Sequence, residues 1–517
     1  MSGQTFNRRA FLKRMGATTG ALYAATTLGS GLLVPNAFGQ TGTLRAAWQN
    51  EWDGFDPHIV STSASFQVLN NVIDTLTTFT DNTQLVPALA TSWEQSEDGR
   101  TWTFHLRDDV RFSNGRQMTA DDVVFSLGRL TDPEIGSGNA GNAGGTDAVW
   151  EAVDQFTVQV TTPEPNGILP RLVGVNKATG IIAEESLEDD GTIQRPIGTG
   201  PFVLAEIDGT TRVRLEANPE YWEPGLPLLE AVEITPIPDE AAREAALLGG
   251  EVDWLWSVPT QSVERFRSES NVVVGTSPDL SYNYMGLNLN REPFDDVRVR
   301  QALAMALDRQ QIVDAAVFGF GRPLQEPIGP GLPEFNFNYR PYDRNIEQAQ
   351  QLLDDAGVGD GFDMELMPNQ GSQPMIRAAE VMQQQLAAIN VNAEIFAPEV
   401  GEWLERQSGG EFDTFMWAWV VLIDPDQYYY LQHHSEGQFN FTGYANEEFD
   451  QLVEQARQTG DTERRKELYE QANKILVDDA PYVYLYNPDR IQAWSSNVQG
   501  FVVRPDGRQN FKRVAVR

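Results

Sequence analysis

Residues able to carry metal or nucleophilic chemistry are scarce in this chain of 517 residues. It contains no cysteine and four histidines, His58, His105, His433 and His434. The lack of cysteine excludes disulfides, thiolate zinc sites, iron–sulfur clusters and thiol catalysis. His433 and His434 are adjacent, so their side chains do not share a face and form a poor pair of metal ligands. His105 is expected on the solvent side of a strand, and we predict no metal site.

Sequence motifs with a defined catalytic geometry are missing as well. The chain has no His-Glu-x-x-His motif, no Walker-type or Gly-x-Gly-x-x-Gly phosphate loop, and no Gly-x-Ser-x-Gly nucleophile elbow. Pairs of carboxylates could serve a glycosidase, but among 74 acidic residues any one pair is weak evidence. The absence of these motifs disfavours an enzyme without excluding one. A secreted hydrolase that uses carboxylates in a cleft is the enzyme that stays open as an alternative.

The charge of the chain restricts its partners. It has 74 Asp and Glu residues against 38 Lys and Arg, a formal net charge of −36 at pH 7. Nucleic acids and anionic membrane surfaces are bound through clustered Lys and Arg, so neither is an expected partner. The acidic residues are dispersed along the chain, which is typical of a solvated surface and not of an acidic tail.

The first 39 residues predict export. Residues 7–14 read Asn-Arg-Arg-Ala-Phe-Leu-Lys-Arg, a weakly apolar stretch covers residues 15–34, and a small-residue cleavage site ends at Gly39. This order is that of a secretory signal, and the paired arginines are typical of bacterial twin-arginine signals. A membrane anchor is the alternative, which the Gly, Ala and Thr content of the stretch disfavours. We predict that residues 1–39 are a twin-arginine-type signal peptide.

Strand and helix patterns must position any site in the remaining chain. Apolar and polar residues alternate over 102–106 and 156–160, which predicts half-buried strands. Capping residues and helical spacing predict further elements, namely helices that begin after Thr119 and Asp239, helices over 299–307, 346–356 and 379–389, and a strand over 391–395. The alternation of the two element types indicates α/β lobes with mixed sheets.

Eight sequence blocks resemble one family in their order and spacing. They are Leu-Val-Pro-Ala-Leu-Ala at 85–90, Asp-Gly-Arg-Thr-Trp-Thr-Phe-His-Leu-Arg at 98–107, Thr-Ala-Asp-Asp-Val at 119–123, Pro-Ile-Gly-Thr-Gly-Pro-Phe at 196–202, Asn-Pro-Glu-Tyr-Trp at 218–222, Ala-Leu-Leu-Gly-Gly-Glu-Val-Asp at 246–253, Asp-Val-Arg-Val-Arg-Gln-Ala-Leu at 296–303 and Asp-Ala-Pro at 479–481. This pattern resembles the family 5 extracellular solute-binding proteins, which serve ABC importers of oligopeptides, dipeptides, nickel and some sugars.

The resemblance implies a two-lobed α/β fold of the periplasmic-binding-protein type, with an extra subdomain inserted in the first lobe. On this basis we assign 40–80, 196–283 and 490–517 to lobe I, 81–195 to the inserted subdomain and 284–489 to lobe II. Such lobes close over a ligand by a hinge motion, because a small solute is held best when it is nearly enclosed.

The same resemblance implies a function. The protein is expected to be a monomer in the periplasm that captures a peptide or similar small solute and delivers it to the membrane subunits of an ABC permease. It implies no enzymatic activity and no cofactor. A sugar derivative, an opine-like compound or nickel is the alternative ligand.

Seven residues match family positions near the cleft and are candidates for ligand contact. They are Trp52, Asp53, Tyr282, Asn283, Trp417, Trp419 and Asp424. Trp52 and Asp53 lie in a glycine-containing loop and are expected to be exposed. Trp417 and Trp419 share one face of a strand with Phe415, and this face is either part of the core or an aromatic platform for the ligand.

One segment departs from the pattern of peptide-binding relatives. These usually carry an acidic residue between the tryptophan and the Asp-Pro pair, where it binds the α-ammonium of the peptide. Here residues 420–423 read Val-Val-Leu-Ile. A buried ammonium without a carboxylate is costly, so a free amine would need another partner, for which Asp424 and Asp53 are the candidates. The departure raises sugar derivatives, opine-like compounds or other amphiphiles as ligands.

Overall fold

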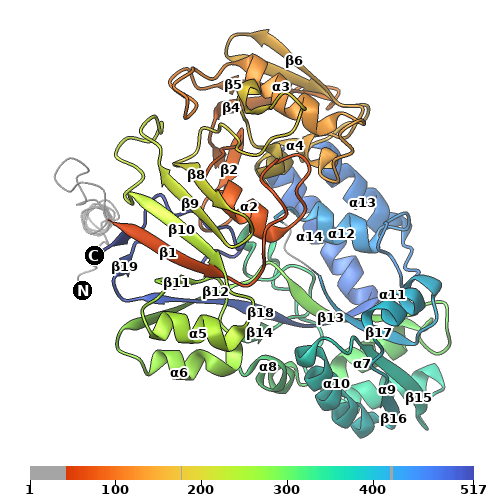
Figure 1. The fold of residues 1–517 in the computed structure, drawn as a ribbon. Helices are drawn as coiled ribbons and strands as arrows, with labels where there is room; N and C mark the ends of the chain where they lie inside the picture. Colours follow the sequence, from red (N-terminus) through yellow and green to blue (C-terminus); the bar gives the residue numbers. More distant parts are fainter. Residues whose placement is uncertain (1–41, 176, 420–422) are drawn as a thin grey trace, which may run out of the picture.

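The computed structural model of the protein describes residues 42–175, 177–419 and 423–517. It has α/β architecture, with a twelve-stranded sheet that extends through two lobes and a separate four-stranded sheet in a subdomain (Figure 1). The predicted signal peptide, residues 1–39, lies outside the described part of the chain. No helix within that part is both long and apolar enough to cross a bilayer.

Lobe I has a mixed sheet. Strand β1 is parallel to both of its neighbours, and the strands farther out pair antiparallel. In spatial order the strands are β11 (Trp254–Leu255), β1 (Thr43–Trp48), β10 (Ala231–Pro236), β9 (Arg212–Ala217) and β8 (Phe202–Asp208). Its helices are α2 (Ser63–Leu69), α5 (Glu240–Leu248) and α6 (Val263–Arg267). The fully buried indoles of Trp48 and Trp254 lie in its core.

Lobe II contains the other half of the sheet and most of the helices. Its strands are β13 (Tyr282–Leu287), β14 (Gly321–Pro323), β15 (Phe362–Pro368), β16 (Val391–Ile395) and β17 (Thr414–Trp419). Its helices are α7 (Val297–Ala306), α8 (Arg309–Val317), α9 (Ile346–Ala356), α10 (Gln373–Leu386), α11 (Val400–Gly409), α12 (Asp426–His433), α13 (Glu447–Gln458) and α14 (Thr462–Asp479). One large apolar cluster fills the lobe.

A single long strand, β18 (Tyr482–Ser495), belongs to both lobes. Its first part pairs with β13 and β14 of lobe II, and its second part pairs with β11 and with β12 (Val272–Pro278) of lobe I. The change of partner falls between Pro488 and Asp489. The connection from β12 to β13 crosses between the lobes beside it, so two adjacent chain segments join the lobes.

The subdomain has its own sheet and its own core. The sheet order is β4 (Ala90–Gln95), β5 (Thr101–Leu106), β7 (Thr157–Thr161) and β6 (Val149–Asp154), and the helices are α3 (Ala120–Thr131) and α4 (Leu169–Val175). A two-stranded ribbon of β2 (Thr77–Phe79) and β3 (Leu85–Pro87) leads into it. The subdomain lies beside α13 and α14 of lobe II (Figure 1), where the Gly167 amide donates to the Arg457 carbonyl at 2.7 Å.

Several predicted elements are confirmed with their caps. The Asp122 carboxylate accepts from the Thr119 amide at 2.9 Å at the start of α3, and Asp239 caps α5 through the Ala242 amide at 2.7 Å. Helix α9 ends at Gly357, whose φ of +83° is the left-handed conformation that glycine adopts without strain.

Candidate functional site

A cavity of about 230 Å³ lies where the two lobes and the subdomain meet. Helix α2 and the loop before it form one wall. The segment after α4 contributes Lys177, the crossing between the lobes contributes Leu280, lobe II contributes Ile423, and the C-terminal segment contributes Asp506 and Arg508. Because all three parts of the fold line the cavity, a solute bound here would contact each of them.

The loop that leads into α2 is ordered by Asp53. Its carboxylate accepts from the Ser65 hydroxyl at 2.6 Å, the Thr62 hydroxyl at 2.8 Å, and the amide and hydroxyl of Ser61, each at 2.9 Å. Partial burial opposes ionisation, but the hydrogen bonds from Ser65 and Ser61 hold the pKa of Asp53 well below its usual value. Asp53 is exposed, as predicted, yet its oxygens are already occupied by the wall of the cavity.

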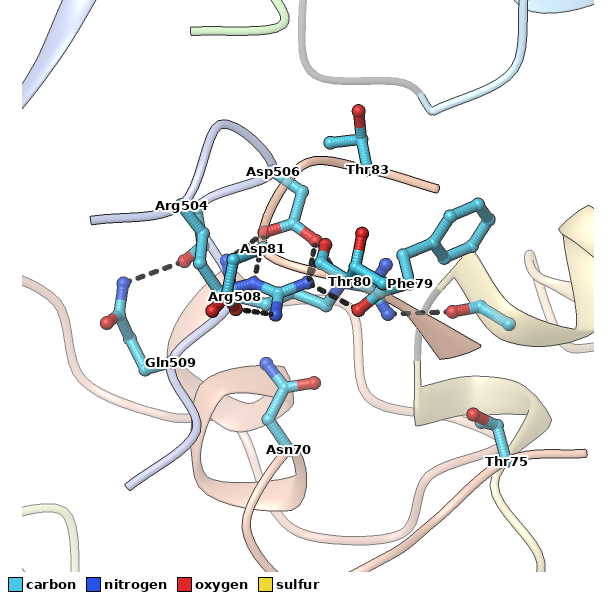
Figure 2. Close-up of polar contacts among 12 residues, drawn as sticks. Asn70, Thr75, Phe79, Thr80, Asp81, Thr83, Arg504, Asp506, Arg508 and Gln509 are labelled. Atoms are coloured by element: carbon cyan, nitrogen blue, oxygen red, sulfur yellow. Dashed lines mark hydrogen bonds and ion pairs between the residues drawn. The ribbon is translucent and has the colours of Figure 1, made fainter. Parts of the chain in front are cut away.

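Arg504, Asp506 and Arg508 form an ion-paired cluster in the C-terminal segment (Figure 2). Asp506 accepts from Arg504 Nη2 and from Arg508 Nε, each at 2.8 Å. Arg504 also donates to the Phe79 carbonyl at 3.0 Å and to Asp81 at 2.7 Å, which ties the segment to the β2–β3 ribbon. Burial disfavours the charged carboxylate, but Arg508 and Arg504 hold the pKa of Asp506 well below its usual value.

Arg508 is held in place but keeps one donor group free. Its Nη1 donates to the Gly174 carbonyl at 2.7 Å and its Nε to Asp506. Its Nη2 is buried and has no hydrogen-bond partner among the residues that the structure describes. The neighbouring backbone is fixed by α2 and the turn after it, because the Gln509 amide donates to Gln67 at 2.9 Å and the Phe511 amide to Asn71 at 3.0 Å.

Lys177 is the second cation of the lining. It begins the short 3₁₀ helix Lys177–Thr179 and is 6% exposed. Within the described part of the chain, no hydrogen bond or ion pair involves its ammonium group. Burial lowers the pKa of Lys177 to about 8, against the opposing effect of Asp74 and with the help of nearby Arg508. The Asp74 carboxylate is itself bound by Trp222 Nε1 at 2.9 Å.

The expected exposure of Trp52 is wrong. Trp52 is 5% exposed and lies in the core of lobe I, where its ring contacts Phe55 at a centroid distance of 5.8 Å. Its indole N–H donates to the Gly209 carbonyl at 3.0 Å. The large apolar ring is buried because it fills space between the loop and the β8–β9 turn, and its polar atom finds a backbone partner there.

Tyr282 and Asn283 begin β13, directly after the crossing between the lobes. Tyr282 is fully buried, its hydroxyl donates to Gln432, and its ring contacts those of Tyr284 and Tyr428. Asn283 is buried and pairs through its backbone with Ala418. Both residues are therefore fixed by β17 and α12, and Leu280, two positions before Tyr282, reaches the cavity.

The aromatic residues on one face of β17 differ in their burial. Phe415 is fully buried, and Trp417 stacks on Trp403 with ring centroids 4.3 Å apart. Trp419 is half-buried against Phe439, with centroids 5.2 Å apart, and its buried indole N–H has no partner among the described residues. Trp419 pairs with Tyr282 at the end of the strand that faces the crossing.

Asp424 is occupied by two arginines. Arg465 donates to its two oxygens at 2.7 and 3.0 Å, and Arg171 Nε lies 2.9 Å from Oδ2. Burial opposes ionisation, but the two guanidinium groups hold the pKa of Asp424 below its usual value. The apolar residues 420–422 lie outside the described residues, and Ile423 is buried in the wall of the cavity.

Lys177, Asp506 and Arg508 were not among the residues expected from sequence. The sequence feature that could have drawn attention to Lys177 is the rarity of lysine, since the chain has only five. His105 is exposed, and within residues 42–175, 177–419 and 423–517 no three His, Asp or Glu side chains converge on a possible metal position.

Comparisons with known proteins identify the family of the chain. The pattern described as bacterial extracellular solute-binding proteins, family 5 middle, matches residues 84–440. The dipeptide-binding protein of Escherichia coli (strain K12) is 29% identical over 511 residues, covering 92% of this chain and 95% of that protein. The glutathione-binding protein GsiB of Shigella boydii serotype 4 is 27% identical over 500 residues, covering 94% and 97%.

A solved structure extends the likeness to three dimensions. HbpA2 from Haemophilus parasuis has a TM-score of 0.83 and 28% identity, with coverage of 92% of this chain and 100% of that one. Its similarity spans both lobes and the subdomain. The chain belongs to the bacterial extracellular solute-binding proteins of family 5, and it is a solute-binding protein of an ABC importer.

Proposed function

We propose that the protein captures a short peptide, or a small solute like one, in the cavity between the lobes and delivers it to an ABC permease. The observation that carries this proposal is the composition of the cavity wall, to which lobe I, lobe II and the subdomain all contribute. A ligand that contacts both lobes favours the arrangement in which they are together. Its binding therefore shifts the lobes toward that arrangement, which a permease can recognise.

The lining suits an amphiphilic solute of modest size. Ser61, Ser63, Gln67 and Asn70 offer neutral polar groups, and the apolar side chains include Phe66. The volume of about 230 Å³ lies below the range of roughly 300–1,000 Å³ that encloses drug-sized ligands. The printed functions of the relatives, dipeptide and glutathione binding, support a peptide or peptide-like ligand.

None of the seven residues selected from sequence is among the side chains that line the cavity. Of these seven we propose Trp419 as a ligand contact beside the cavity, because its buried indole N–H has no partner among the described residues and its ring is half-buried next to the crossing. Trp417 and Asn283 flank it on β17 and β13. Trp52, Asp53, Tyr282 and Asp424 contribute by holding the surrounding walls through the contacts described above.

We propose that residues 1–39 direct export by the twin-arginine route and that the protein works as a monomer in the periplasm. The paired arginines of the N-terminal segment and the periplasmic location of the relatives support this.

Thermal unfolding of the purified protein tests the proposal. A ligand present at 100 times its dissociation constant stabilises the native state by about 2.7 kcal/mol. We expect a concentration-dependent rise in the unfolding midpoint with di- or tripeptides and none with oligosaccharides. A rise produced only by sugars, opine-like conjugates or nickel would contradict a peptide ligand.

A further inference from the structure

We infer that the cavity binds its ligand through a carboxylate held by Lys177, and that a free amine on the ligand is not required. This inference rests on the proposed function, because it names the chemical class of solute that the same cavity accepts. The argument depends on which charged groups in the lining are already neutralised and which are not.

Lys177 differs from the other described lysines in its surroundings. Lys474 forms an ion pair with Asp478 and Lys512 one with Glu223, and Lys466 is exposed to solvent. Lys177 is 6% exposed, lines the cavity and has no carboxylate within 4.0 Å among the described residues. Asp74 acts on its charge from beyond ion-pair distance, and burial still lowers the pKa of Lys177. Burying a cation without a close counterion is costly, so a bound anion would compensate the remaining charge.

Arg508 adds a second donor to the same lining. Its Nη2 is buried and has no partner within the described part of the chain, although the rest of the guanidinium is fixed by Asp506 and the Gly174 carbonyl. An oxygen anion bound to Lys177 can therefore draw on a rigidly placed guanidinium beside it, and charge-assisted hydrogen bonds of this kind are the stronger ones. The arrangement is notable in a chain of net charge −36.

The cavity offers no comparable receptor for an ammonium group. Asp506 is the acidic residue among those that line it, and Arg504 and Arg508 both bind its carboxylate. Asp424 is neutralised by Arg465 and Arg171, and Asp53 has its oxygens filled by hydroxyl and amide donors. In the sequence, the three residues before Ile423 are Val-Val-Leu and carry no charge.

Isothermal titration of the purified protein against matched peptides tests the inference. The probes are glutathione and a set of di- and tripeptides, and each peptide of the set is used as the free acid, the C-terminal amide and the N-acetylated acid. We expect the free and N-acetylated acids to bind with similar affinity, and the amides to bind at least about tenfold more weakly, the effect of one charge-assisted hydrogen bond.

Two variants connect the result to Lys177. In Lys177→Met we expect weaker binding of the acids and loss of the difference between acid and amide, and in Lys177→Arg we expect part of that difference to return. Lys474→Met, which removes an exposed lysine on α14, is the matched control and should bind as the unaltered protein does. Circular dichroism of each variant establishes that it is folded.

The outcomes separate the inference from the proposed function. Equal binding of acids and amides would overturn the carboxylate site at Lys177, and loss of binding on N-acetylation would overturn the claim that no free amine is required. Either result leaves peptide capture standing. If Lys177→Met still bound the acids more tightly than the amides by the same factor, the carboxylate site at Lys177 would be overturned as well. If none of the peptides binds in any form, the proposed peptide function fails, and the inference fails with it.

Discussion

Arg171 of the subdomain lies 2.9 Å from the carboxylate of Asp424 in lobe II, within a fully buried cluster that Arg465 completes. Asp424→Asn would leave two buried guanidinium groups without their shared counterion. We expect a loss of about 3–5 kcal/mol in the free energy of unfolding, the usual cost of removing one partner of a buried ion pair. Urea unfolding followed by circular dichroism measures it.

Asp109→Asn is the control for this variant. Asp109 pairs with Arg107 at 2.7 Å, but its side chain is 56% exposed. Exposed ion pairs contribute about 0–1 kcal/mol, so this change should have a small effect. Similar losses for the two variants would contradict the role given to the buried cluster.

Gly167 marks a close approach between the subdomain and lobe II. A Cβ atom at this position would lie 2.1 Å from the backbone of Thr459. Gly167→Ala should therefore force the two surfaces apart, lower the affinity for any solute that needs the lobes together, and increase the radius of gyration in small-angle X-ray scattering. Gly128→Ala, in α3 where a Cβ meets no atom within 4 Å, should leave both quantities unchanged. If Gly167→Ala left the ligand affinity and the radius of gyration unaltered, the close contact between the subdomain and lobe II at Gly167 would be contradicted.

Trp419 and Trp403 provide a matched pair on and beside β17. Trp419→Ala should weaken binding of a peptide with an aromatic side chain by roughly tenfold, because an aromatic pair contributes about 0.5–1.5 kcal/mol, and should cost little stability. Trp403 is 1% exposed and donates to the Met367 carbonyl at 3.0 Å, so Trp403→Ala should lower the free energy of unfolding by about 3–5 kcal/mol. Titration calorimetry and urea unfolding distinguish the two effects. Unaltered peptide affinity in Trp419→Ala would remove it from the site.

His433 makes the native state sensitive to acid. Burial lowers the pKa of His433 to about 3 from 6.5, so the unfolded chain binds a proton that the folded one excludes. The contribution of the neutral His433 to the free energy of unfolding is complete above pH 6.5. It is lost as the pH falls toward 3, at about 1.4 kcal/mol per pH unit. In His433→Leu the fall in unfolding free energy between pH 6.5 and 5 should be smaller by about 2 kcal/mol. His105→Gln, at an exposed site, should follow the unaltered protein; an identical fall in all three proteins would refute the assignment.

Lys177 gives a pH dependence of the same sign at alkaline pH. Its pKa of about 8 in the fold lies below the usual 10.5, so the unfolded chain holds the proton more tightly between these values. Stability of the ligand-free protein should therefore rise by about 3 kcal/mol across this interval. Tyrosines also titrate there, so the quantity to measure is the difference from Lys177→Met. A carboxylate bound at Lys177 would raise its pKa, and affinity should fall as the pH rises above 8. If the difference in unfolding free energy between the unaltered protein and Lys177→Met stayed constant from pH 8 to 10.5, the lowered pKa of a buried Lys177 ammonium would be refuted.

The elements predicted correctly are those whose signals are local. Thr119 with Asp122, Asp239 and Gly357 all lie within a few residues of the backbone groups that they cap or terminate. The strand at 391–395 is likewise bounded by its own alternation and by the helix before it. Local spacing therefore predicts these elements without knowledge of the tertiary structure.

The site depends on contacts that local spacing does not encode. Trp52 is buried because Gly209, 157 positions away, accepts its indole proton. Lys177 and Arg508 meet at one cavity only because α4, α2 and the C-terminal segment pack together. The family pattern predicted the lobes and the cleft, and it could not predict which charged side chains in the cleft would be left without a partner.

The C-terminal segment completes the cavity through hydrogen bonds from Gln509 and Phe511 to Gln67 and Asn71, about 440 positions earlier in the chain. This wall can therefore form only after residues 509–511 have been synthesised, and a shorter nascent chain cannot hold solute there. The protein becomes able to bind solute in the compartment where this segment folds against α2. On the twin-arginine route that we propose, this compartment is the cytoplasm, so each newly made receptor encounters the solutes of its own cell before those outside.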